Sequence, residues 1–261
     1  MKKKSKVLNV LLWVISAILV CVLLFSAYQI YSIFAMYNAE SEAHADLMQY
    51  KPSDGDIPET STNPNSSEHI DKTPGTPADN TSLDPLIAKN RDVKGWITVD
   101  NTYIDYPFVQ ADNNEHYLHT DVDKNYIESG ALFLDCNSKS DFSVFNTIMY
   151  GHNMKNGSMF GSLPWFNNKN FFDENTTGKL FLRNRTFEIE IFACLVVQED
   201  DKNIYCYPTS QKSVDEFAKY VSKNAAFYRK TDLKITDSIV TLSTCSYEFD
   251  EARTVVIGKL I

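Results

Sequence analysis

The sequence predicts a mainly β fold, a closed β-barrel built from eight candidate strands, which follows an N-terminal membrane helix. Three observations support this prediction. An uncharged apolar run near the N-terminus is long enough to cross a bilayer, a polar proline-rich stretch follows it, and many short β-like runs with turn signals make up the remainder. The strand pattern alone leaves a β-sandwich open as the alternative architecture.

The composition excludes several classes of protein. Hydrophobic residues make up 43% and aromatic residues 13% of the 261 residues, which excludes a wholly disordered or fibrous chain. The formal net charge is −9, and a body this acidic repels nucleic-acid phosphates. The five cysteines form no CxxC motif and no Cys/His ladder, so we expect neither a disulfide framework nor a structural zinc site. We also expect no other metal and no cofactor.

The apolar run predicts a single membrane anchor. Four lysines lie within residues 1–6, and residues 7–27 are mostly apolar and uncharged. As a helix the run spans about 31 Å, enough to cross the hydrocarbon core of a bilayer. The lysines predict a cytoplasmic N-terminus, so the remainder of the chain is expected outside the cell. A cleaved signal peptide is the alternative, but its apolar core would be shorter, about 7–15 residues.

Residues 28–82 are expected to connect the anchor to the folded domain. Residues 28–50 are apolar enough to continue the helix past the bilayer, whereas residues 51–82 hold five of the nine prolines and no aromatic residue. Such a composition cannot bury enough surface to offset its chain entropy. We therefore predict a flexible tether with a reach of about 30 Å, followed by one folded domain over residues 83–261.

The eight candidate strands all lie within this domain. They are residues 96–99, 102–110, 131–136, 146–152, 179–184, 185–197, 237–245 and 253–261. A short helix is predicted over residues 85–91. A longer helix is predicted from Ser213, which forms a capping-box pattern with Glu216, and Val214, Phe217 and Val221 would share its apolar face.

Cys245 is the first candidate catalytic residue, because it ends the strand of residues 237–245. Arg253 follows eight residues later, and if the last two strands pair antiparallel, the two side chains face each other at the mouth of the loop. A fixed cation favours the thiolate and can stabilise a developing oxyanion. The alternative is that Cys245 is a small buried hydrophobic residue.

His152 is the second candidate catalytic residue. It follows an apolar strand and Gly151, so it also lies at the end of a strand. An imidazole in this place can act as general base or acid for a thiol nucleophile. The alternative is a loop histidine without a catalytic role.

Three motifs in this order resemble the sortases, and most closely class B. They are YGHNM (150–154), TLSTC (241–245) and EARTVVIGKLI (251–261), and the resemblance extends over essentially all of residues 83–261. The predicted helix of residues 213–228, inserted before the TLSTC strand, is the class B feature. The resemblance implies an eight-stranded sortase-type β-barrel and a membrane-anchored cysteine transpeptidase on a Gram-positive cell surface.

The resemblance also implies substrates and roles. Cys245 would attack a C-terminal sorting motif of the LPxTG or NPxTx type after its Thr, His152 would transfer protons, and Arg253 would stabilise the oxyanion or position the motif. Ser243, Thr244 and Tyr247 would line the groove for the motif. The partners would be secreted proteins that carry the motif, an amine of the peptidoglycan cross-bridge, and membrane lipid around residues 7–27. A hydrolytic cysteine peptidase and a non-enzymatic surface module remain the alternatives.

Three further signals have weaker functional interpretations. His116, His119, Asp121 and Asp123 have a loosely metal-like spacing that we interpret as a solvated loop. The aromatic residues between 159 and 172 are interpreted as core packing, with a lid over the groove as the alternative. Cys194 and Cys206 are the one pair for which a disulfide is left open.

Overall fold

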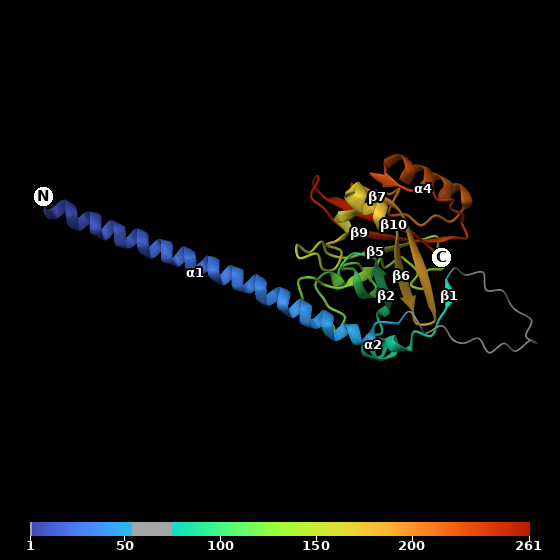
Figure 1. Ribbon diagram of the computed structural model, residues 1–261, viewed down its shortest axis with the longest axis horizontal. Coiled ribbons are helices and arrows are strands. Elements are labelled where there is room, and N and C mark those ends of the chain that lie inside the picture. Colours follow the sequence, from blue (N-terminus) through green and yellow to red (C-terminus); the bar gives the residue numbers. More distant parts are fainter. Residues whose placement is uncertain (1, 54–74) are drawn as a thin grey trace, which may run out of the picture. The chain divides into compact units, whose positions relative to one another are not determined.

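The computed structural model describes residues 2–53 and 75–261 (Figure 1). Most of the predicted tether falls on residues 54–74, outside the described residues. The chain divides into two compact units, residues 1–46 and residues 47–261.

The first unit is formed by one long helix, α1 (Lys2–Leu47). Its residues include no glycine or proline, so nothing in the backbone interrupts the helix. From Leu11 onward the helix is long and apolar enough to cross a membrane, by length and composition. The predicted anchor of residues 7–27 lies within it, and residues 28–47 continue the same helix.

The second unit contains a closed barrel of eight strands, as the sequence predicts (Figure 1). Their order around the barrel is β7-β10-β9-β5-β4-β3-β2-β6, and β6 pairs with β7 to close it. The strands are β2 (Val93–Val99), β3 (Asp105–Val109), β4 (Leu132–Leu134), β5 (Asn146–Tyr150), β6 (Thr177–Leu182), β7 (Arg185–Gln198), β9 (Ser238–Cys245) and β10 (Ala252–Leu260). Two short strands, β1 (Thr76–Pro77) and β8 (Phe227–Tyr228), add to β7.

Most neighbouring strands of the barrel are antiparallel, but two pairs are parallel. They are β3 with β4 and β5 with β9. The side chains inside the barrel are large and apolar, and they include Phe108, Phe187, Leu242 and Val256. Burying this surface is the main stabilisation of the fold and holds the strand ends in fixed positions.

The inserted helix α4 (Gln211–Asn224) packs on the outside of the barrel against β7. Val214, Phe217 and Val221 are buried, as the helical spacing predicts. The predicted start is wrong by one turn, because the N-cap is Ser210 and Ser213 is its capping-box partner. The helix also ends earlier than residue 228. Residues 227–228 form β8 instead, because they pair with β7.

The compact unit also extends N-terminally of the predicted boundary at residue 83. The Lys51 ammonium lies 2.6 Å from the Asp105 carboxylate, and Asn80 Nδ2 donates to the carbonyl oxygen of Leu182 at 2.6 Å. The short helix α2 (Asp84–Lys89) matches the one predicted over residues 85–91. Its residue Leu86 is buried. Segments on both sides of residues 54–74 therefore contribute to the packing of the barrel.

Candidate active site

Cys245 and Arg253 are neighbours across the last hairpin of the barrel. Cys245 is the final residue of β9, and it pairs directly with Arg253 of β10. The predicted antiparallel pairing is therefore confirmed. Beyond this pair the Ser246 amide donates to the Ala252 carbonyl oxygen at 2.9 Å, which closes the base of the connecting loop. Cys245 itself is exposed, so its thiol is open to a substrate.

The parallel pairing of β5 with β9 brings His152 to the same place. Tyr150 of β5 pairs with Ser243 of β9, and continuing this register by two residues matches His152 with Cys245. Hydrogen bonds continue past the end of β5 in agreement with that register. Thr244 Oγ1 donates to the Gly151 carbonyl oxygen at 2.7 Å, and Asn153 Nδ2 donates to the Cys245 carbonyl oxygen at 2.8 Å.

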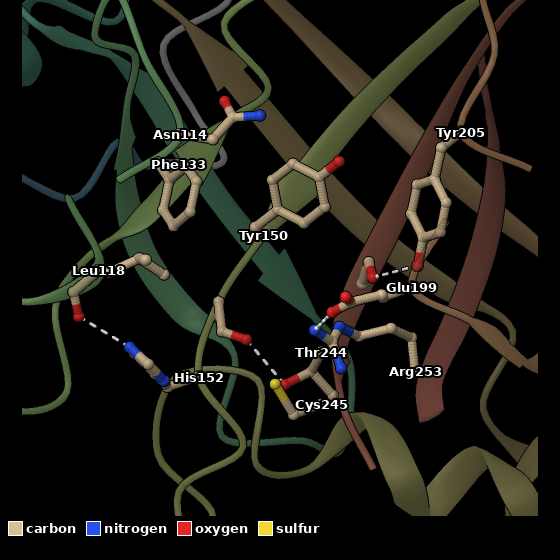
Figure 2. A pocket seen from close by; sticks show the side chains of 12 residues that line it. Asn114, Leu118, Phe133, Tyr150, His152, Glu199, Tyr205, Thr244, Cys245 and Arg253 are labelled. Carbon is tan, nitrogen blue, oxygen red and sulfur yellow. Dashed lines mark hydrogen bonds and ion pairs between the residues drawn. The ribbon is translucent and has the colours of Figure 1, made fainter. Parts of the chain in front are cut away.

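These residues line one open pocket of about 210 Å³ (Figure 2). In this view Cys245 lies between His152 on one side and Arg253 on the other. The lining residues come from four strands (β4, β5, β9 and β10) and from the segments that connect strands: Asn114, Leu118, Phe133, Tyr150, Gly151, His152, Glu199, Tyr205, Ser243, Thr244, Cys245 and Arg253. The pocket therefore combines a thiol, an imidazole and a guanidinium, the three groups expected from the sequence.

The orientation of His152 is set by a backbone carbonyl. The imidazole points toward Leu118, and His152 Nε2 lies 2.7 Å from the Leu118 carbonyl oxygen (Figure 2). A carbonyl oxygen only accepts hydrogen bonds, so Nε2 carries a hydrogen in this arrangement. In the neutral ring Nδ1 is then the nitrogen that can accept a proton. Sequence reasoning supplied no residue that orients His152, because a backbone acceptor has no side-chain signature.

Glu199 is a pocket residue that sequence reasoning missed. Its carboxylate forms an ion pair with the Arg253 guanidinium, and Arg253 Nη1 also donates to the Ala252 carbonyl oxygen at 3.1 Å. The side chain of Arg253 is only 24% exposed, so this ion pair is less screened than one on the open surface. Glu199 follows the end of β7, and β7 pairs with β10, so only that pairing reveals its proximity to Arg253.

The three predicted groove residues differ in their positions. Ser243 and Thr244 are buried in the pocket wall, and the Ser243 hydroxyl lies 2.8 Å from the hydroxyl of Tyr205. Burial raises the pKa of Tyr205 to about 12, so its hydroxyl stays protonated at neutral pH. Tyr247 is 80% exposed and does not line the pocket, because it lies beyond the β9 ladder in a loop that turns outward.

The far wall of the pocket is organised around the buried Asp135. One carboxylate oxygen accepts from Asn114 Nδ2 at 2.8 Å and from the Tyr150 hydroxyl at 3.2 Å, and the other accepts from the Tyr207 hydroxyl at 2.7 Å. Burial alone would raise the pKa of Asp135, but the hydrogen bonds from Tyr207, Asn137 and Asn114 outweigh it and hold the pKa below its usual value. The ionised carboxylate therefore fixes two lining side chains, Asn114 and Tyr150.

The other cysteines differ from Cys245. All five cysteines lie in the described residues and are free, so Cys194 and Cys206 do not form the disulfide left open above. Burial raises the pKa of Cys194 to about 12 and that of Cys206 to about 11. Neither thiol is therefore ionised near neutral pH, whereas Cys245 is exposed at the pocket.

The structure also shows where the aromatic segment and the two histidines His116 and His119 lie. The aromatic segment contributes Phe160, Phe166 and Phe172 to the core, which confirms the core interpretation for these three residues, whereas Trp165 is 38% exposed. His116 lies against Tyr117, while His119 lies against His152. Within residues 2–53 and 75–261, no three potential ligand side chains converge on a metal site.

The chain is similar in sequence and in fold to several known proteins. The Sortase domain family model matches residues 97–261. The chain is 34% identical to sortase B of Listeria monocytogenes over 177 residues, which cover 66% of this chain and 71% of that protein. The fold is similar to the X-ray structure of Clostridium perfringens sortase B, with a TM-score of 0.64 and 34% identity over 68% of this chain and 98% of that one. A Streptococcus pyogenes class B sortase involved in pilus biogenesis matches with a TM-score of 0.63 and 33% identity, covering 69% and 97% of the two chains.

Proposed function

Because the chain belongs to the sortase family and is a cysteine transpeptidase of class B, we propose that it cleaves a C-terminal sorting motif and transfers the cleaved protein to a cell-wall amine. The motif is of the LPxTG or NPxTx type, and cleavage follows its Thr. The observation that carries this proposal is the convergence of Cys245, His152 and Arg253 on one open pocket.

In the first half of the reaction Cys245 Sγ attacks the carbonyl carbon of the motif's Thr. The thiolate forms a C–S bond, and the Arg253 guanidinium stabilises the negative charge that develops on the carbonyl oxygen. The C–N bond to the next residue then breaks. Nδ1 of the His152 imidazolium donates its proton to the departing amine, while Nε2 stays bound to the Leu118 carbonyl oxygen. The products are a thioester on Cys245 and the C-terminal fragment of the motif.

In the second half an amine of the peptidoglycan cross-bridge attacks the thioester. His152 Nδ1 accepts the proton from the incoming nitrogen, a new amide C–N bond forms, and the C–S bond breaks to regenerate the thiolate. The thioester conserves most of the free energy of the cleaved peptide bond. Transfer to an amine therefore needs no nucleotide cofactor.

The long helix α1 would anchor this activity at the cell membrane. Residues 7–27 would span the cell membrane once, with residues 1–6 in the cytoplasm and the barrel outside, because basic residues favour the cytoplasmic side. Clients and cross-bridge amines both occur on the outer side of the membrane.

A peptide assay with the full-length protein in detergent micelles tests the proposal. The protein is incubated with a panel of motif peptides, with and without an amine nucleophile, and the products are identified by mass spectrometry. We expect cleavage after Thr, an amine adduct, and loss of both products in Cys245→Ala and His152→Ala. Cleavage without any adduct would instead identify a hydrolytic peptidase, and an intact peptide would contradict the proposal.

A further inference from the structure

His119 has no role in the reaction described above, yet its ring stacks with that of His152. The two ring centroids are 5.6 Å apart and the ring planes differ by 28°. His119 also stacks with Tyr126, at 6.0 Å and again 28°. Such separations fall within the range in which stacked rings attract each other. Three rings, Tyr126, His119 and His152, therefore form a continuous stack that ends at the pocket.

The outer part of this stack is held by local structure. Thr120 and Tyr126 form an antiparallel bridge, and the Ile127 amide donates to the His119 carbonyl oxygen at 3.1 Å. The Tyr126 hydroxyl donates to Glu128 Oε1 at 2.6 Å, and Glu128 Oε2 lies 3.9 Å from His119 Nδ1. The hairpin of residues 119–128 thus fixes the plane of the His119 ring even though its side chain is 52% exposed.

The adjacent residue, Leu118, holds His152 in a different way. Its carbonyl oxygen bonds His152 Nε2, but a single hydrogen bond leaves the ring free to rotate about the N···O direction. A neighbouring ring stacked on the imidazole removes this freedom. Leu118 and His119 together therefore define both the direction and the plane of the His152 ring.

We propose that His119 is a positioning residue, which through its stacked ring holds the imidazole of His152 with Nε2 on the Leu118 carbonyl and Nδ1 free for proton transfer. This inference rests on the proposed acid–base role of His152. His119 touches neither substrate nor thiol in this scheme, and its aromatic face, rather than its charge, is what His152 requires.

Three substitutions in the full-length protein test whether His152 requires the aromatic face of His119 or its charge. His119→Ala removes the ring, and His119→Phe keeps an aromatic face without a titratable group. His116→Ala is the matched control, because His116 lies in the same segment but its ring contacts Tyr117. We expect His119→Ala to lower kcat about tenfold with KM changed less than twofold, and His119→Phe and His116→Ala to stay within about twofold of the unsubstituted protein.

A second measurement does not depend on turnover. Proton–nitrogen NMR spectra of protein labelled with ¹⁵N-histidine report the tautomer of His152, whose signals are identified by their absence in His152→Ala. For the neutral His152 ring we expect the Nε2–H tautomer in the unsubstituted protein and in His119→Phe, and a mixture of tautomers in His119→Ala.

The two measurements distinguish failure of this inference from failure of the proposed function. Unchanged His152 signals and unchanged kcat in His119→Ala would overturn the positioning role. Equal losses in His119→Phe and His119→Ala would also overturn it, because the ring would then not be the required feature. A change in tautomer confined to His119→Ala, in a protein that forms no amine adduct with any peptide, would support the positioning role and contradict the transpeptidase proposal.

Discussion

The two sides of the pocket are built in different ways. On one side Cys245 and Arg253 are the end pair of an uninterrupted ladder that runs to Ser238 and Leu260. On the other side His152 lies beyond the last residue of β5, and its ring is held by the Leu118 carbonyl and the stack with His119. The positions of the Cys245 thiol and the Arg253 guanidinium are thus fixed by strand register, whereas the position of the His152 imidazole depends on loops.

This difference separates two kinds of mutational effect. A substitution at the end of the ladder removes a chemical group while the backbone stays in place, because the pairs beneath it maintain the register. A substitution around the loop side changes where a chemical group points. Variants on the ladder side, compared with the His119 variants, measure how far the two sides differ.

The largest effect is expected for Cys245→Ala. Loss of the nucleophile should reduce peptide cleavage at least about 10³-fold, because no other group in the pocket can form the thioester. The measurement is the cleavage rate together with the mass of the acyl-enzyme. Cys136→Ala is the control, since that thiol does not line the pocket, and it should keep activity within about twofold. A covalent adduct that persists in Cys245→Ala would show that another residue is the nucleophile.

The next effect concerns the geometry of the guanidinium. Arg253→Lys should be nearly as damaging as Arg253→Ala, with each lowering kcat/KM about 10²-fold, because an ammonium cannot reproduce the planar fork. Arg183→Lys is the matched control, because Arg183 pairs with Asp79 and Asp84 outside the pocket. Nearly normal kcat/KM in Arg253→Lys would mean that charge alone suffices.

A smaller effect is expected for the partner of that guanidinium. Glu199→Gln should lower kcat about tenfold, because Arg253 then loses the charged acceptor that orients it. Glu188→Gln serves as the control, because Glu188 lies on β7 itself and does not line the pocket. Equal kinetic constants in Glu199→Gln and the unsubstituted protein would show that the ladder orients Arg253 without Glu199.

The smallest effect is expected for Cys194 on β7, the strand that pairs with the other edge of β10. Cys194 of β7 pairs with Val256 of β10, and its buried thiol has a pKa of about 12. At pH 8 the thiolate fraction is about 10⁻⁴, and it rises only as the pH approaches the raised pKa. Cys194→Ala should therefore change kcat/KM less than about twofold. Iodoacetamide at pH 8 should label Cys245 and leave Cys194 unmodified until the protein unfolds, so rapid labelling of Cys194 in the folded protein would contradict this assignment.

The ladder side of the pocket was accessible from the sequence, and the loop side was only partly accessible. Period-two alternation and the short loop after Cys245 place Arg253 opposite it, because hairpin pairing is local. His152 was recognised by its strand-end position and its motif, but its proximity to Cys245 depends on the parallel pairing of β5 with β9. That pairing joins segments more than ninety residues apart, and no local pattern encodes it.

The missed and misplaced residues have related causes. Leu118 acts through its backbone and Glu199 through a strand pairing, so neither has a recognisable side-chain pattern. Ser210 was missed as the N-cap because Ser213 with Glu216 forms an equally good capping-box pattern. The resemblance implies a groove position for Tyr247, whose side chain is 80% exposed and lies outside the pocket, so its groove role stays a prediction.

The parallel pairing of β5 with β9 also determines at which stage of folding Cys245 and His152 come together. Contacts between distant segments form late in folding, since the intervening chain must first be ordered. Under the proposed mechanism, Cys245 and His152 come together only when β5 pairs with β9, so thioester formation requires the closed sheet.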